Sequence, residues 1–194
     1  MKRPLPSTQS ILKHWREAVP DDRLAHLVKD ATRALVRALQ MRLAEYGVSF
    51  GHWTFLRILW VGDGLTQREL SEQAGVMEPT TFSALKAMGR LGYVRRAKRG
   101  GDRKKVYVIL TPKGRQLRNR LVPLAEEVNR IAVRGVRSRD IAVTRTVLLA
   151  LIENLARDEA AADMRMPSTR ELAQLKAGGR KRRLRKHTRQ VESR

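Results

Sequence analysis

The chain has 194 residues, of which 42% are hydrophobic, so it can bury the core of one compact domain with appendages. It has no cysteine and only four scattered histidines, which excludes disulfides and Cys-ligated zinc and argues against any metal site. No apolar run of about 18 residues occurs and the first residues are too charged for a signal sequence, so we expect a cytoplasmic protein without membrane contact, and the net charge of +22 favours a polyanionic partner, chiefly nucleic acid.

The N-terminal region combines a short arm with a long amphipathic helix. In residues 1–21, apolar side chains at helical spacing predict a short helix. From residue 22 onward, apolar residues recur every three or four positions until Gly47 ends the pattern. A helix of this length needs a second helix, or a second chain, to cover its apolar stripe. We therefore assign residues 22–48, together with residues 111–163, to a helical dimerisation region.

A helix rich in aromatic residues, 50–60, comes next and is broken by the Gly-Asp-Gly sequence at 62–64. Its aromatic side chains lie on more than one side, which indicates burial between layers or a pocket wall. In the following segment Thr66 is a good N-cap, and Glu69, three residues later, completes a capping-box pattern. Gly75 is expected to end this short helix.

Residues 79–91 are predicted to form a helix with one apolar and one polar face. Pro79 fits the first turn, where its missing N–H costs nothing. Phe82, Leu85 and Met88 are expected to point inward. The opposite face carries small hydroxyls and cations but no acid, and its members are Thr80, Thr81, Ser83, Lys86, Ala87 and Arg90. Such a face suits the major groove of DNA, where hydroxyls contact phosphates or bases and Lys or Arg reads guanine.

A basic β-hairpin follows in the sequence YVRRAKRGGDRKKVYVIL, from residue 93 to residue 110. Between residues 86 and 105, nine Lys and Arg are opposed only by Asp102, and contact with phosphate explains this charge. Asp102 either pairs with a nearby arginine and orders the tip, or is an ordinary turn residue. With the preceding helices, the hairpin predicts a winged helix-turn-helix DNA-binding region over residues 49–110.

Two further helices and a basic tail complete the chain. Thr111 is the predicted N-cap of the first helix and Ser138 that of the second. Together with the long helix from residue 22, these two helices carry more apolar surface than three short helices would need to cover one another. This surplus favours dimerisation. Residues 164–194 hold 11 Lys and Arg against Glu171 and Glu192, and we expect this tail to be disordered or to become ordered only on DNA.

These elements, in this order, resemble the MarR family of bacterial transcriptional regulators. LTQRELSEQAGV resembles the supporting helix of the family, EPTTFSALKAMGRLGYV its recognition helix, and GDRKKVYVILTPKG the end of its wing and the start of the next helix. The resemblance covers residues 22–160 and is strongest from 65 to 114. It implies a mainly α fold with a small β-hairpin wing, in which a winged helix-turn-helix head is joined to a helical dimerisation base.

The resemblance also implies a way of acting. A homodimer would bind a pseudo-palindromic operator in double-stranded DNA and release it when a small, often aromatic, acidic effector binds. Arg103 would be the wing-tip arginine and Asp102 its ordering acid, while Lys104 and Gly89 stand where Arg and Glu are common. The predicted DNA-binding residues are Thr66, Gln67, Thr80, Thr81, Ser83, Lys86, Arg90, Arg96, Lys98, Arg99, Asp102, Arg103 and Lys104.

Ligand-binding residues are predicted on the helices that form the pocket in the family. They are Trp15, His52, Trp53, Phe55 and Arg57. An Arg or His beside aromatic rings can hold an aromatic carboxylate. The alternative, which we favour for the aromatic residues, is that they only pack in the core.

The sequence therefore predicts a sequence-specific transcriptional regulator, and we expect a repressor with a small-molecule effector. The alternative is an architectural DNA- or RNA-binding protein that uses the winged helix without sequence choice, which the high charge and basic tail favour. We expect neither an enzyme nor a cofactor, because no nucleophile–base–acid set, glycine-rich phosphate loop or metal constellation occurs.

Overall fold

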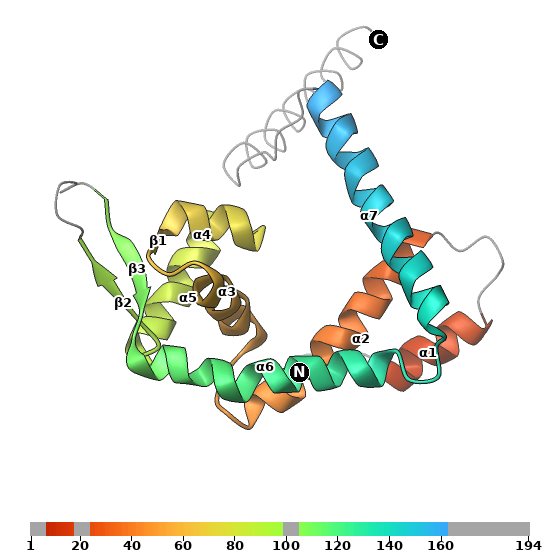
Figure 1. Ribbon diagram of the computed structural model, residues 1–194, viewed down its shortest axis with the longest axis horizontal. Helices are drawn as coiled ribbons and strands as arrows, with labels where there is room; N and C mark the ends of the chain where they lie inside the picture. Colours follow the sequence, from red (N-terminus) through yellow and green to blue (C-terminus); the bar gives the residue numbers. More distant parts are fainter. Residues whose placement is uncertain (1–6, 18–23, 99–104, 163–194) are drawn as a thin grey trace, which may run out of the picture. The chain divides into compact units, whose positions relative to one another are not determined.

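The computed structural model describes residues 7–17, 24–98 and 105–162 (Figure 1). The helices are α1 (Thr8–Glu17), α2 (Leu24–Ala44), α3 (Phe50–Val61), α4 (Gln67–Ala74), α5 (Glu78–Arg90), α6 (Pro112–Ala132) and α7 (Ser138–Ala161). The strands are β1 (Leu65–Thr66), β2 (Val94–Ala97) and β3 (Tyr107–Leu110). This composition confirms the predicted class, mainly α with a small β wing. The chain divides into two compact units, Met1–Gly135 and Val136–Arg194.

The sequence also predicts a basic tail and no membrane-spanning segment. The predicted tail, residues 164–194, lies outside the described residues. Among the helices that are described, none is both long enough and apolar enough to cross a membrane.

The sheet has the strand order β1-β3-β2, and both of its pairings are antiparallel. β2 pairs with β3 from Val94 opposite Leu110 to Ala97 opposite Tyr107, which forms the predicted hairpin. β1 pairs with the other edge of β3 and adds a strand that the sequence does not predict. The reason is its length, because two residues between a glycine-rich turn and a helix show no alternation.

The helix α3 lies at the centre of the core of the first unit. It packs against α2, α4, α5, α6 and β3, and its Leu56 and Leu59 are almost completely buried. Trp53 is also buried and meets Trp60 edge to face, with ring centroids 5.6 Å apart. The prediction that the aromatic residues of this helix indicate burial between layers is therefore confirmed.

The starts of α4 and α6 follow the capping residues predicted from the sequence. The Thr66 hydroxyl accepts a hydrogen bond from the Glu69 amide at 3.3 Å, and the Glu69 carboxylate accepts one from the Thr66 amide at 2.6 Å. Gly75 ends α4 with a φ of 64°, in the left-handed region. At the start of α6, the Thr111 hydroxyl accepts from the Gly114 amide at 3.1 Å. These caps place the helix-turn-helix and α6 relative to the sheet.

The described part of the second unit is the helix α7. Ser138, predicted as its N-cap, is instead its first residue, because Arg137 holds the cap position and pairs with Asp140 at 2.7 Å. No residue of α7 is buried. Its exposed large apolar side chains are Ile141, Val143, Val147, Leu148, Leu149, Ile152 and Leu155.

Candidate nucleic-acid interface

The inward face of α5 is formed by Thr81, Leu85 and Met88, which are all buried. The Thr81 side chain accepts a hydrogen bond of 2.7 Å from the Ser71 hydroxyl of α4. The prediction that Thr81 faces the major groove is therefore wrong, and so is the prediction that Phe82 points inward, since Phe82 is 45% exposed. A threonine looks polar in a sequence, but a partner hydroxyl allows it to be buried at the contact between two helices.

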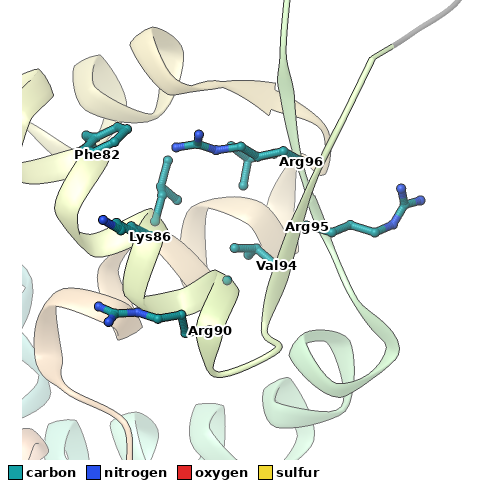
Figure 2. Close-up of a pocket in the computed structure, with 9 residues that line it drawn as sticks. Phe82, Lys86, Arg90, Val94, Arg95 and Arg96 are labelled. Atoms are coloured by element: carbon teal, nitrogen blue, oxygen red, sulfur yellow. The ribbon is translucent and has the colours of Figure 1, made fainter.

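The outward face of α5 carries Thr80, Ser83, Lys86 and Arg90, all of them exposed as predicted. The Ser83 hydroxyl donates to the Pro79 carbonyl one turn earlier, at 3.0 Å, and its oxygen keeps the capacity to accept a hydrogen bond. Lys86 and Arg90 are one turn apart and project from the same side of the helix (Figure 2). The exposed face of α5 therefore offers hydroxyls and cations to a ligand.

Thr66 and Gln67, predicted to contact DNA, stand at the start of α4 and are half-buried. The Thr66 hydroxyl is already engaged by the capping box with Glu69. In the structure this hydroxyl caps the start of α4. A direct contact of either residue with DNA stays a prediction.

A groove of about 580 Å³ lies between α5 and the wing strands (Figure 2). It is lined by Phe82, Leu85, Lys86, Gly89, Arg90, Val94, Arg95, Arg96 and Val108. Arg96 extends from β2 across the Phe82 ring, with its guanidinium carbon 5.3 Å from the ring centroid. Arg95 points to the other side of β2, because successive side chains of a strand alternate. Among the described residues that line the groove, none is Asp or Glu and four are Lys or Arg.

The outer part of the wing is only partly described. Lys98, the last described residue after β2, is exposed as predicted. Arg99, Asp102, Arg103 and Lys104 lie outside the described residues, and their roles stay predictions.

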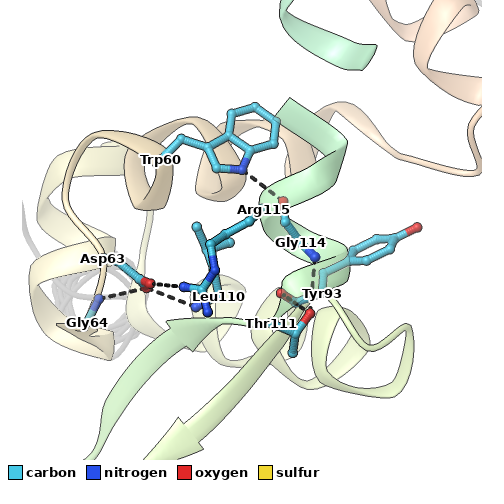
Figure 3. Close-up of polar contacts among 8 residues, drawn as sticks. All are labelled: Trp60, Asp63, Gly64, Tyr93, Leu110, Thr111, Gly114 and Arg115. Atoms are coloured by element: carbon cyan, nitrogen blue, oxygen red, sulfur yellow. Dashed lines mark hydrogen bonds and ion pairs between the residues drawn. The ribbon is translucent and has the colours of Figure 1, made fainter. Parts of the chain in front are cut away.

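Asp63, in the turn after α3, holds the root of the wing (Figure 3). One of its carboxylate oxygens accepts hydrogen bonds from the amides of Gly64 and Leu110, each at 2.9 Å. The other pairs with Arg115 at 2.8 Å. One carboxylate thus joins the end of α3, the last residue of β3 and the first turn of α6. The sequence indicates only a turn here, because the partners lie 47 and 52 residues away.

Gly114 brings the first turn of α6 against the backbone beside β2 (Figure 3). A Cβ at this position would overlap the carbonyl oxygen of Tyr93, so the contact requires glycine. Trp60 Nε1 donates to the Gly114 carbonyl at 2.9 Å. The Thr111 hydroxyl donates to the Gly92 carbonyl at 2.6 Å. The end of α3, the connection from α5 to β2, and the first turn of α6 therefore meet in one hydrogen-bonded joint.

A separate cavity of about 340 Å³ lies between α2, α3 and α6. Its lining residues are Thr32, Leu35, Val36, Leu39, Phe50, Trp53, Thr54, Arg57, Ala125, Val128 and Asn129. Of the predicted ligand residues, Trp53 and Arg57 line it. Phe55 is buried in the core, which confirms the packing alternative for this residue. Trp15 lies on α1, where its Nε1 donates to Asp30 of α2 at 3.2 Å.

His52, the remaining predicted ligand residue, does not line this cavity either. Its ring meets that of Tyr93 edge to face, with centroids 6.5 Å apart. Its Nδ1 is buried and has no hydrogen-bond partner among the described residues. Burial lowers the pKa of His52, because the charged ring would lose its hydration. A neutral ring suits packing better than it suits holding a carboxylate.

Comparison with known proteins assigns this arrangement to a family. The model of the MarR family matches residues 48–106, most of the predicted winged helix-turn-helix region of residues 49–110. Over 141 residues the chain is 30% identical to the HTH-type transcriptional regulator TtmR of Methylorubrum extorquens (strain PA1), covering 72% of this chain and 68% of that protein.

Solved structures show the same fold. A MarR transcriptional regulator from Methanosarcina mazei Go1 has a TM-score of 0.63 at 25% identity, covering 69% of this chain and 96% of that one. BpsR of Bordetella bronchiseptica, whose DNA binding is regulated by 6-hydroxynicotinic acid, has a TM-score of 0.59 at 19% identity, covering 70% and 99%. The exposed face of α5, the basic wing and these similarities together establish that the chain belongs to the MarR family of transcriptional regulators, which bind DNA through a winged helix.

Proposed function

We propose that the protein is a homodimeric, sequence-specific repressor that binds a pseudo-palindromic operator in double-stranded DNA and leaves it when a small acidic ligand binds. The observation that carries this proposal is the exposed face of α5, with Ser83, Lys86 and Arg90, beside the groove that Arg96 also lines. In the major groove, Lys86 can reach the O6 and N7 acceptors of guanine, and hydroxyls can contact bases or phosphates. The basic strand β2 then follows the phosphate backbone.

Dimer formation is supported by the exposed apolar side chains of α7. Each buried CH₂ group is worth about 0.8 kcal/mol, so a second chain that covers this helix would gain considerable free energy. In this proposal residues 22–48 and 111–163 form the dimer base, and two heads of residues 49–110 read the two half-sites. Sedimentation at micromolar concentration should give a mass about twice the 22.2 kDa of one chain. A persistent monomer would contradict the two-headed mechanism.

The proposed effector site is the cavity between α2, α3 and α6. Arg57 would hold a carboxylate there, and Trp53 would offer a ring face to an aromatic ligand. The regulation of BpsR by 6-hydroxynicotinic acid, in a protein of the same fold, supports an aromatic acid. Such acids should release DNA from the wild type and fail to release it from Arg57→Gln, while release from both proteins would place the ligand elsewhere.

Lys86→Ala is expected to weaken binding to the operator by about 1–3 kcal/mol and to weaken binding to random DNA less. The reason is that a base contact exists only on the correct sequence, whereas phosphate contacts exist on all sequences. The operator is first selected from a random pool with the wild-type protein. Fluorescence anisotropy over a salt series then compares the selected duplex with a scrambled one.

Lys13→Ala is the matched control, because Lys13 is an exposed lysine of α1, outside the proposed dimer base and the head, and its loss removes the same charge. It should affect the two duplexes equally. If Lys86→Ala also affects them equally, or if no sequence is enriched in the selection, the alternative of an architectural DNA- or RNA-binding protein is favoured instead.

A further inference from the structure

Phe82 is a large apolar residue on the DNA-binding side of α5 that does not serve the core. Its side chain is 45% exposed, while the adjacent Thr81 is completely buried. A single exposed apolar residue needs no functional explanation in itself. Phe82 differs because it lines the groove between α5 and β2, where four of the eight other lining residues are cations: Lys86, Arg90, Arg95 and Arg96.

The ring of Phe82 lies against the guanidinium group of Arg96. The guanidinium carbon lies 5.3 Å from the ring centroid, in a cation–π contact, and it reaches the ring from the wing strand (Figure 2). This contact limits the rotamers of the ring before DNA arrives, which lowers the entropic cost of using it as a contact surface. The exposed remainder of the ring is available for contact with bases in the major groove of DNA.

An apolar ring on a DNA-binding helix has one apolar partner on the base edges of the major groove, the C5-methyl group of thymine. We propose that Phe82 is a specificity-determining residue that packs on a thymine methyl group, and that Arg96 positions its ring. This inference rests on the proposed sequence-specific binding by α5. It assigns the recognition of an A·T pair to Phe82, a contact that the hydroxyls and cations of α5 do not provide.

The spacing on α5 predicts where this thymine lies. Phe82 and Lys86 are four residues apart, which corresponds to a rise of about 6 Å along the helix. Base pairs follow one another every 3.4 Å or so. The thymine should therefore lie within about two base pairs of the position at which Lys86→Ala relaxes specificity.

The test removes only the methyl group from the DNA. The operator is selected with the wild-type protein and with Phe82→Ala, and each conserved thymine is then replaced by deoxyuridine. For the wild type, deoxyuridine at the assigned position should weaken binding about fourfold per half-site, the value of one buried methyl-sized group. For Phe82→Ala, thymine and deoxyuridine should bind equally. Phe82→Leu keeps an apolar side chain and should retain part of the preference.

Two controls separate the inference from its alternatives. Leu12→Ala removes an exposed apolar side chain of α1, which is 44% exposed, and should leave the preference for thymine intact. Arg96→Gln should reduce both the thymine preference and the salt dependence of binding; a change in salt dependence alone would show that Arg96 contacts phosphate without positioning the ring.

The outcomes distinguish this inference from the proposed function. A thymine preference that survives Phe82→Ala, or an equal loss on all sequences, overturns the inference, because the ring would then contact sugar or nothing. A selection that enriches no sequence with the wild type contradicts the proposed function itself, and with it the inference.

Discussion

Replacing Gly114 by alanine is expected to lower the free energy of unfolding by about 3 kcal/mol. The new Cβ would overlap the carbonyl oxygen of Tyr93, which is a backbone atom and cannot rotate away as a side chain could. Relief requires the first turn of α6 to move away from the wing, and this would break the hydrogen bond from Trp60 to the Gly114 carbonyl. Urea denaturation followed by circular dichroism, at one fixed protein concentration, measures the loss.

Gly89→Ala provides the comparison for this substitution. Gly89 lies within α5, and a Cβ there would come no closer than 4.0 Å to the Val94 carbonyl oxygen, an ordinary contact. Since alanine has a higher helix propensity than glycine, this variant should gain up to about 1 kcal/mol in stability. Equal effects of the two substitutions would show that the close approach at Gly114 does not determine the outcome.

Asp63→Ala is expected to cost about 2–3 kcal/mol of stability. The variant leaves the amide of Leu110 without its acceptor at the end of β3, where the Leu110 side chain is 2% exposed. It also frees Arg115 and the Gly64 amide. The wing root would lose its tether to α3, so binding to DNA should weaken as well. Thermal and urea denaturation give the stability, and anisotropy on the selected operator gives the affinity.

Arg115→Ala separates the ion pair from the backbone hydrogen bonds. The Arg115 side chain is 56% exposed, so its pair with Asp63 is screened by water, and its loss should cost less than about 1 kcal/mol. The Leu110 amide keeps its acceptor in this variant. If Arg115→Ala destabilises the protein as much as Asp63→Ala, the role of Asp63 lies in the ion pair and not in holding the strand.

Features encoded by neighbouring residues could be predicted from the sequence. Thr66 and Glu69 form their capping box because the two partners are three residues apart. The helix predicted over 79–91 is observed as Glu78–Arg90, since Pro79 favours its first turn and Gly92 follows its end. The hairpin was predicted from two apolar runs that flank a turn sequence. In each case the signal lies in the same continuous segment of the chain as the structure that it predicts.

The inward face of α5 could not be predicted, because burial there depends on a residue of another helix. The hydroxyl of Ser71 supplies the hydrogen-bond partner that allows Thr81 to be buried, while the next residue, Phe82, is exposed. The anchoring by Asp63 is equally non-local. At the cavity, Trp53 and Arg57 share one side of α3 because they are one turn apart, whereas Phe55, two residues after Trp53, points to another side and into the core.

The buried hydrogen bond between Ser71 and Thr81 links the evolution of two positions on different helices. A hydroxyl at one position without a partner at the other would be buried and unsatisfied, at a cost of about 1–3 kcal/mol. Two apolar side chains of matching size would avoid that cost. Among related chains we therefore expect positions 71 and 81 to change together, as two hydroxyls or as two apolar residues. A mixed pair should be rare, since a protein with one unpaired buried hydroxyl would be less stable than either matched pair.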